Sequence, residues 1–304
     1  MAVHITKQGD RVPVGAINVL IYGQPSTGKT SVCYTMKNPL VIDFDGGAHR
    51  SQQSTLGTTV RVDTWADVEE VMTSVVPEYS TIIIDTVGSA LDYMAAYIIA
   101  TNPKMGTAKG TLTMQGWGEL KAVFQQWFKR LNVAGKDVVM IAHHREEKEG
   151  DATRKRPDIQ GSSYGLVMKQ ADFVGFAHLN EASQRVIGFA PTADYFGKDS
   201  ARLGVVHVAD LDAEQTYGAA LIDQMRNAFA KNADEHQQAI AELANWRAII
   251  AAWAGADDVN IMLANIKKLQ EPLATQVKAL AAERAKALML SFDKKAGKYV
   301  GAGL

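Results

Sequence analysis

Short apolar runs recur along the first two thirds of the chain, and stretches with helical spacing separate several of them. The runs that predict β-strands are Ala16–Tyr22, Leu40–Phe44, Thr58–Val62, Thr81–Asp85, Val138–Ala142 and Asp172–His178. The stretches that predict helices are Thr30–Met36, Trp65–Val75, Ser89–Ala100 and Trp117–Val133. Strands that alternate with helices are typical of an α/β fold, so we expect a doubly wound, mostly parallel sheet.

Two polar connections, Thr101–Gly118 and His144–Lys169, interrupt this alternation and exceed the ordinary length of a loop. Connections of such length are usually functional or disordered. Beyond them, Arg185–Pro191 and Leu203–Ala209 predict further strands, with a turn at Gly197–Asp199 between them. We expect these strands to extend the sheet in the antiparallel sense.

From about Ala213 the chain becomes rich in Ala, Leu, Gln, Lys and Glu, and its apolar residues take helical spacing. Three apolar stripes result: Leu243, Trp246, Ile250 and Trp253; Val259, Met262, Ile266 and Leu269; Leu273, Val277 and Leu280. We therefore divide the chain into an α/β core, residues 1–212, and a small helical module, residues 213–304. The closing polar segment Lys294–Leu304 contains glycines and is expected to fray.

The segment GQPSTGKT, residues 23–30, fits the phosphate-loop pattern G-x-x-x-x-G-K-[ST] in full, between a predicted strand and a predicted helix. Lys29 would reach the β- and γ-phosphates, and the hydroxyl of Thr30 would ligate Mg²⁺. The other residues expected to surround the polyphosphate are Gly23, Gln24, Pro25, Ser26, Thr27, Gly28 and Ser31. The motif predicts binding of ATP with Mg²⁺; the alternative is a glycine-rich turn that binds nothing.

Polar side chains end three of the predicted strands. Asp85 is the candidate second ligand of Mg²⁺, or else a helix cap. Alternation places Asp43 and Asp45 on one face, where one of them could orient the water that attacks the γ-phosphate; a plain strand-end turn is the alternative. His143 could sense the γ-phosphate, or be an ordinary polar strand end. A zinc site at His143 and His144 is disfavoured, because adjacent strand residues diverge and no further ligand stands at suitable spacing.

The two long connections carry cations and one aromatic residue that suit contact with a single nucleic-acid strand. We name as candidate DNA-binding residues Lys104, Lys109, Arg154, Lys155, Arg156, Tyr164 and Lys169. A mixed-charge, solvated loop is the alternative. Trp117 is expected to lie in the core and not to serve as a stacking platform.

Charge, cysteine content and apolar runs limit the function classes. The formal net charge is −1, so any contact with DNA must be local and not a uniformly basic surface. The single cysteine, Cys33, excludes an intramolecular disulfide framework and fits a reducing compartment. No apolar run approaches the ~18 residues of a membrane span. We expect a cytoplasmic protein without membrane association.

Over roughly residues 15–210 the chain resembles the RecA-type recombinase core, especially the short ATP-binding recombinases of bacteriophages linked to single-strand annealing. Besides the phosphate loop, the segments VIDFD, residues 41–45, and IIIDTVGSAL, residues 82–91, carry the resemblance. It implies Asp45 as the water-activating acid, where the bacterial family has Glu, and His143 at the sensor position, where it has Gln. It also implies that the two connections are the DNA-binding loops and that Lys198 and Arg202 reach a neighbouring subunit's nucleotide.

These features predict a DNA-dependent ATPase of RecA type that forms a homo-oligomer, filament or ring, on single-stranded DNA and promotes annealing or strand exchange. Its catalytic residues would be Lys29, Asp45, Asp85 and His143. One alternative is a switch or assembly protein with weak hydrolysis, whose helical module holds a partner such as a single-strand binding protein. A small-molecule P-loop kinase is the other, although the acid-rich segment Glu146–Asp151 makes a poor phosphate lid.

Overall fold

The computed structural model describes residues 6–7, 12–150, 152–161 and 163–301. The chain divides into two compact units, one formed by Pro13–Ala230 and the other chiefly by Lys231–Leu304. Helix α6, Tyr217–Ala251, begins in the first unit and ends in the second.

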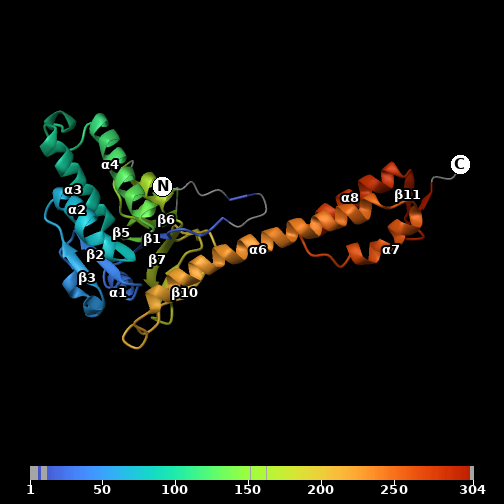
Figure 1. Cartoon of the computed structure of the whole chain (residues 1–304), viewed down its shortest axis with the longest axis horizontal. Helices are drawn as coiled ribbons and strands as arrows, with labels where there is room; N and C mark the ends of the chain where they lie inside the picture. Colours follow the sequence, from blue (N-terminus) through green and yellow to red (C-terminus); the bar gives the residue numbers. More distant parts are fainter. Residues whose placement is uncertain (1–5, 8–11, 151, 162, 302–304) are drawn as a thin grey trace. The chain divides into compact units, whose positions relative to one another are not determined.

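Ten strands form one sheet within the described part of the first unit (Figure 1). They are β1 (Asn18–Gly23), β2 (Pro39–Asp43), β3 (Thr58–Arg61), β4 (Thr81–Asp85), β5 (Asp137–Glu149), β6 (Ala152–Pro157), β7 (Phe173–Leu179), β8 (Arg185–Gly188), β9 (Lys198–Asp199) and β10 (Val205–His207). The order is β10-β8-β7-β1-β5-β4-β2-β3, with β6 on β5 and β9 on β7. All pairings from β7 to β3 along this order are parallel, whereas β8 and β10 add antiparallel strands. The predicted fold class is confirmed.

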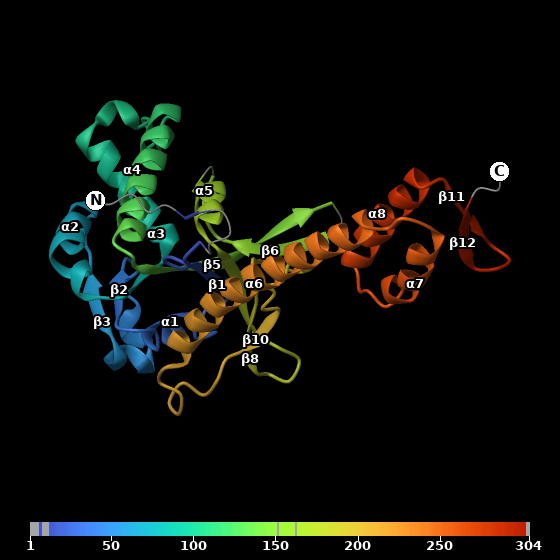
Figure 2. The same ribbon diagram turned by 45° about the vertical axis from the view of Figure 1, so that its right-hand side comes forward.

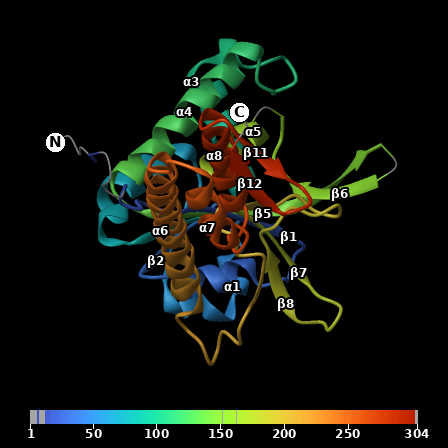
Figure 3. The ribbon, with the colours of Figure 1, turned by 90° about the vertical axis from the view of Figure 1, so that its right-hand side faces the viewer.

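Helices cover both faces of the sheet. In β1, Leu20 and Tyr22 enter one apolar core, and Val19 and Ile21 enter the other. The first core lies under α2 (Trp65–Glu70), α3 (Val87–Thr101), α4 (Met114–Val133) and α5 (Ser163–Gln170), and the second under α1 (Lys29–Tyr34) and the first turns of α6 (Figures 2 and 3). Burial on both faces explains why the central strands are continuous apolar runs.

Short helical turns fill several connections of the first unit. They are η1 (Ala48–Arg50), η2 (Gln52–Leu56), the π-helical η3 (Val71–Val75), η4 (Val76–Glu78) and η5 (Pro103–Met105). The first long connection is shorter than expected, because α4 begins at Met114. The hydroxyl of Thr113 accepts a hydrogen bond from Gly116 N and so caps this helix three residues earlier than the apolar pattern indicates.

The second long connection is a β-hairpin followed by a helix, which corrects the prediction of a loop over His144–Lys169. Strand β5 continues past the sheet to Glu149 and pairs with β6, and Figure 3 shows this hairpin extending beyond the sheet. Glu146 lies opposite Lys155, and Glu147 lies opposite Arg154. Opposite charges on paired strands stabilise the pair. The mixed charges of this segment, which are also typical of a solvated loop, therefore reflect the pairing of β5 with β6.

A second correction concerns Gly197–Asp199, which was expected to be a turn. Lys198 and Asp199 form β9 and pair with Val174 and Phe173 of β7. On its β7 side, strand β8 pairs with the residues Phe176–Leu179 and does not reach Phe173 and Val174. Strand β9 therefore satisfies backbone groups that β8 leaves open.

The second unit packs two helices and a hairpin around its own core. Its elements after α6 are α7 (Ala256–Ile266), α8 (Leu273–Ala287), β11 (Leu290–Asp293) and β12 (Lys298–Gly301). Members of all three predicted apolar stripes meet in this core. The prediction of a frayed tail is wrong for β12, because Asn260 exchanges two hydrogen bonds with the backbone of Tyr299, whose ring also packs on Phe292. Residues 302–304 lie outside the described residues.

Candidate functional site

The phosphate loop needs glycine at both ends. Gly23 ends β1, and a Cβ there would lie 2.2 Å from the carbonyl oxygen of Ala177 on the neighbouring strand. Gly28 has a φ of 82°, a left-handed conformation that side chains disfavour. Helix α1 starts at the next residue, Lys29. The local structure is therefore the strand, tight loop and helix that the motif predicts.

Lys29 is held inside the curve of this loop. Only 7% of it is exposed, and Nζ donates to the carbonyl oxygens of Gly23, at 3.1 Å, and Gln24, at 2.7 Å. Burial lowers the pKa of Lys29, an effect that nearby Asp85 opposes. A polyphosphate that accepted hydrogen bonds from this ammonium would take the place of the loop's own carbonyls.

Thr30 and Asp85 form the candidate metal site. Thr30 Oγ1 donates to Asp85 Oδ2 at 2.8 Å. Burial raises the pKa of Asp85 to about 6; the bond from Thr30 opposes this, and the nearby carboxylates of Asp45 and Asp43 add to it. Magnesium is usually bound by one or two carboxylates together with waters and substrate phosphates. A half-buried hydroxyl and a buried carboxylate beside the phosphate loop fit that donor set.

Asp43 and Asp45 play different parts, although both follow the same strand. The buried carboxylate of Asp43 accepts hydrogen bonds from three backbone amides, those of Asp45, Gly47 and Ala48, at 3.0–3.2 Å. Asp43 therefore shapes the turn, as the strand-end alternative predicts. Asp45 reaches the site instead: its Oδ1 accepts from Thr86 Oγ1 at 3.4 Å, and its Oδ2 lies 3.8 Å from His143 Nε2.

The four predicted catalytic residues line one cavity of about 270 Å³, hereafter the nucleotide cavity. The sheet register explains this meeting, because Gly23 lies opposite His143 and Asp43 lies opposite Asp85. The lining residues are Pro25, Ser26, Gly28, Lys29, Thr30, Ser31, Asp45, Gly47, Arg50, Ser51, Asp85, Thr86, Ile141 and His143. The structure thus brings Lys29, Asp45, Asp85 and His143 together, and the role of each stays a prediction.

Two cations at this site were missed by sequence reasoning. Arg50, the last residue of η1, lines the cavity. Arg185, at the start of β8, lies so close to the loop that a Cβ on Gly28 would be 3.5 Å from its Nη1. Neither residue belongs to a sequence motif. The turn after β2 places Arg50 at the site, and the β7–β8 hairpin places Arg185 there. Thr86, by contrast, directly follows Asp85 and could have been inferred from that position.

Lys198 and Arg202 lie away from their own chain's phosphate loop. Lys198 Nζ donates to the carbonyl oxygen of Ala171, before the start of β7, whereas the phosphate loop follows the other end of the parallel strand β1. Arg202 is exposed in the turn after β9, with a φ of 59°. Their action on a neighbour's nucleotide stays a prediction.

The candidate DNA-binding residues fall into two groups. Lys104, Lys109 and Lys169 are exposed. The hairpin cations are half-buried: Arg154 lies over the ring of Phe196 at 5.7 Å, and Lys155 lies over Phe176 at 5.8 Å.

Arg156 and Tyr164 are also engaged by the fold. Arg156 Nε lies 3.7 Å from Glu147 Oε2, and the half-buried Tyr164 packs on the first apolar core. Trp117 packs there as well, as expected, although part of it remains exposed. Contact of these residues with DNA stays a prediction.

Comparison with known proteins identifies the class. A family model described as an AAA domain matches residues 16–201. The chain belongs to this family of P-loop NTPases, which implies nucleotide binding. The RecA-type recombinase resemblance stays a prediction.

Two individual proteins are similar to parts of the chain. It is 26% identical over 139 residues to the SPbeta prophage-derived uncharacterized protein YorG of Bacillus subtilis (strain 168). This match covers 43% of the chain and only 42% of that protein's length. Among solved structures, the flagellar accessory protein FlaH from Methanocaldococcus jannaschii aligns with 66% of this chain and 93% of its own, with a TM-score of 0.35 and 13% identity.

In the part of the chain that the structure describes, every helix is too short or too polar to cross a bilayer.

Proposed function

We propose that this protein is an ATPase of RecA type whose hydrolysis depends on single-stranded DNA and that promotes annealing or strand exchange in recombination. The phosphate loop and the nucleotide cavity support the ATPase part. The similarity of part of the chain to a prophage-derived protein is compatible with a phage origin.

One observation carries the coupling to DNA: strand β5 belongs to the nucleotide cavity and to the cation-bearing hairpin at once. His143, on β5, lies beside Asp45, and the strand runs on without a break to Glu149. The returning chain closes on the same residue, because Asp158 N donates to the carbonyl oxygen of His143 at 2.8 Å. A DNA strand that repositioned the hairpin would thus move His143 relative to Asp45.

Each side chain of the nucleotide cavity would have its own role in phosphoryl transfer. Lys29 would hold the phosphates, Asp45 would orient the attacking water, and His143 would report the state of the γ-phosphate to the hairpin. Magnesium, when bound by Thr30 and Asp85, would neutralise charge on the phosphates. Arg50 and Arg185 are further cations placed to contact the nucleotide.

Assembly on DNA belongs to the same proposal. Subunits would stand side by side, with Lys198 and Arg202 of one directed to the nucleotide of the next. The second unit, which has its own core, would serve as an adaptor for a partner such as a single-strand binding protein.

Phosphate release with and without single-stranded DNA tests the proposal. We expect DNA to stimulate release and Lys29→Ala to abolish it, because the variant lacks the charge inside the loop. Lys37→Ala, which removes an exposed lysine just beyond α1, is the matched control and should behave as wild type. ATP binding with no effect of DNA on the rate would remove the DNA-dependent part and favour the switch or assembly alternative.

A further inference from the structure

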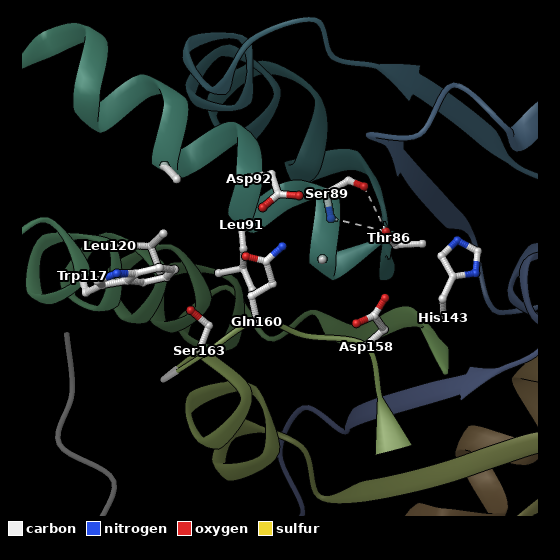
Figure 4. A pocket seen from close by; sticks show the side chains of 12 residues that line it. Thr86, Ser89, Leu91, Asp92, Trp117, Leu120, His143, Asp158, Gln160 and Ser163 are labelled. Atoms are coloured by element: carbon white, nitrogen blue, oxygen red, sulfur yellow. Dashed lines mark hydrogen bonds between the residues drawn. The ribbon is translucent and has the colours of Figure 1, made fainter. Parts of the chain in front are cut away.

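A second cavity, of about 140 Å³, adjoins the nucleotide cavity and shares Thr86 and His143 with it (Figure 4). We call it the acidic pocket. Helices α3 and α4, the end of the sheet part of β5 and the segment after β6 enclose it. Its lining residues are Thr86, Gly88, Ser89, Leu91, Asp92, Ala95, Trp117, Leu120, His143, Asp158, Gln160 and Ser163.

The charge of this pocket is opposite to that of a phosphate site. Asp92 and Asp158 line it, and the described residues that line it include neither lysine nor arginine. Burial raises the pKa of Asp92, and the negative charges of Asp158 and Asp45 add to the effect. The pocket therefore disfavours an anion and favours a group that donates hydrogen bonds from nitrogen.

A buried hydroxyl in the pocket has no hydrogen-bond partner among the described residues. Ser163 is 3% exposed, and its Oγ makes no hydrogen bond with the described residues. In Figure 4 this oxygen points toward the side where Trp117 lies. A buried polar group costs free energy until it is paired. The hydroxyl thus offers a donor and an acceptor to a ligand.

The remaining walls suit a flat ring. The indole of Trp117 and the side chains of Leu91 and Leu120 form an apolar side, and the amide of Gln160 stands at the polar side (Figure 4). The cavity is much smaller than the ~300–1,000 Å³ of sites for drug-sized ligands. It has room for one ring system and not for a whole nucleotide.

We propose that the acidic pocket receives one base of a bound DNA strand and selects bases that carry an exocyclic amino group. This inference rests on the proposed function, since it assumes that the strand is DNA held by this face. Amino N–H groups of cytosine match carboxylate acceptors, whereas thymine presents a carbonyl oxygen at the same position and is disfavoured. Stacking on the half-exposed Trp117, a role opposite to the sequence expectation, accepts any base and adds affinity without selection.

The position of the pocket allows a bound base to affect the nucleotide cavity. Thr86 Oγ1 donates to Asp45 Oδ1 at 3.4 Å and accepts from Ser89 N at 3.4 Å, so one hydroxyl touches both cavities. The phosphate backbone would stay outside, where Arg145 Nη1 donates to the carbonyl oxygen of Ile159 at 3.3 Å beside the pocket rim.

Binding of labelled oligo(dC) and oligo(dT), of equal length and at equal salt and neutral pH, tests the inference. We expect oligo(dC) to bind about tenfold more tightly. Asp158→Asn should bring the ratio of the two dissociation constants close to one. Asp63→Asn, which neutralises a carboxylate that is 80% exposed and is not among the lining residues of the pocket, should leave the ratio unchanged.

A second variant separates stacking from selection. Trp117→Leu should weaken both oligonucleotides by a similar factor and keep the ratio. Equal affinities in the wild type, or a ratio unchanged by both Asp158→Asn and Asp92→Asn, overturn the base pocket while leaving DNA binding intact. A pocket variant that alters self-association but not the ratio also overturns it, and indicates a cationic protein side chain as the occupant. Absence of binding to either oligonucleotide contradicts the proposed function itself.

Discussion

The nucleotide cavity and the acidic pocket lie side by side at the carboxyl end of the sheet, but their side chains are held differently. In the nucleotide cavity, Lys29 and Asp85 are buried and hydrogen-bonded. In the acidic pocket, Asp158 and Gln160 are exposed, and the hydroxyl of Ser163 has no partner among the described residues. Side chains that are buried and hydrogen-bonded suit a polyphosphate, whose structure is always the same. Polar groups that are exposed or unpaired suit a nucleobase, whose identity varies along a DNA strand.

The largest expected effect separates a residue of the nucleotide cavity that acts in ATP hydrolysis from one that stabilises the fold. Asp45→Asn should slow ATP hydrolysis on the order of 100-fold while the free energy of unfolding stays near that of the wild type, because among the described residues its carboxylate bonds only Thr86 and approaches His143. Phosphate release and urea unfolding measure the two quantities.

Asp43→Asn is the matched control, and it should lower the free energy of unfolding more than it affects the chemistry of hydrolysis. It weakens bonds to three backbone amides and should cost about 1–3 kcal/mol of stability. If Asp45→Asn unfolded the protein and Asp43→Asn left it intact, the assignment of the two carboxylates would be reversed.

The next effect is a dependence of stability on pH that comes from the nucleotide cavity. The pKa of Asp85 is raised to about 6, chiefly by burial, above the value of ~3.9 for an exposed aspartate. The folded chain therefore binds this proton more tightly than the unfolded chain. Ionisation of Asp85 then destabilises the fold progressively as the pH rises from about 4 to about 6, by roughly 3 kcal/mol in total, and the cost is constant above that range.

Asp85→Asn removes this titration. Urea unfolding of wild type and variant between about pH 4 and 7 should show the variant gaining stability relative to the wild type as the pH rises. A difference between the two proteins that did not change with pH would show that Asp85 has an ordinary pKa in the folded chain.

The nucleotide cavity could be predicted largely from sequence, because its residues stand in one contiguous motif or directly after apolar strands. Parallel strands end at a common edge, so Asp45, Asp85 and His143 could be expected near the phosphate loop without knowledge of the strand order. The separation of Asp43 from Asp45 could not, since it depends on which carboxylate the turn's amides capture. Arg185 was also out of reach, because it arrives from the β7–β8 hairpin.

The acidic pocket could not be predicted, because its lining residues come from four separate segments of the chain, 86–95, 117–120, 143 and 158–163. Trp117 comes from α4, Asp92 from α3, and Ser163 from the start of α5. The sequence predicted a long loop where the structure has the β5–β6 hairpin. The position of Asp158 beside His143, where Asp158 N donates to the carbonyl oxygen of His143, could therefore not be predicted.

The smallest expected effect compares two buried hydroxyls. Thr35 is 1% exposed, and its Oγ1 donates to the carbonyl oxygen of Val32 at 2.7 Å and accepts from Gly218 N at 2.8 Å. Thr35→Val leaves Gly218 N without its acceptor, although Val32 O keeps the hydrogen bond from Thr35 N, and should cost about 1–2 kcal/mol of unfolding free energy. Ser163→Ala removes a hydroxyl without a partner among the described residues and should change stability by less than about 0.5 kcal/mol in either direction.

Urea unfolding of both variants measures this difference, and the binding ratio of oligo(dC) to oligo(dT) shows what the unpaired hydroxyl does. Ser163→Ala should lower the ratio by about two- to threefold, since one neutral hydrogen bond to the base is lost. A cost for Ser163→Ala as large as that for Thr35→Val would mean that the hydroxyl is already satisfied within the fold. The two cavities would then be alike in holding their polar groups fixed, and the contrast between them would rest on charge alone.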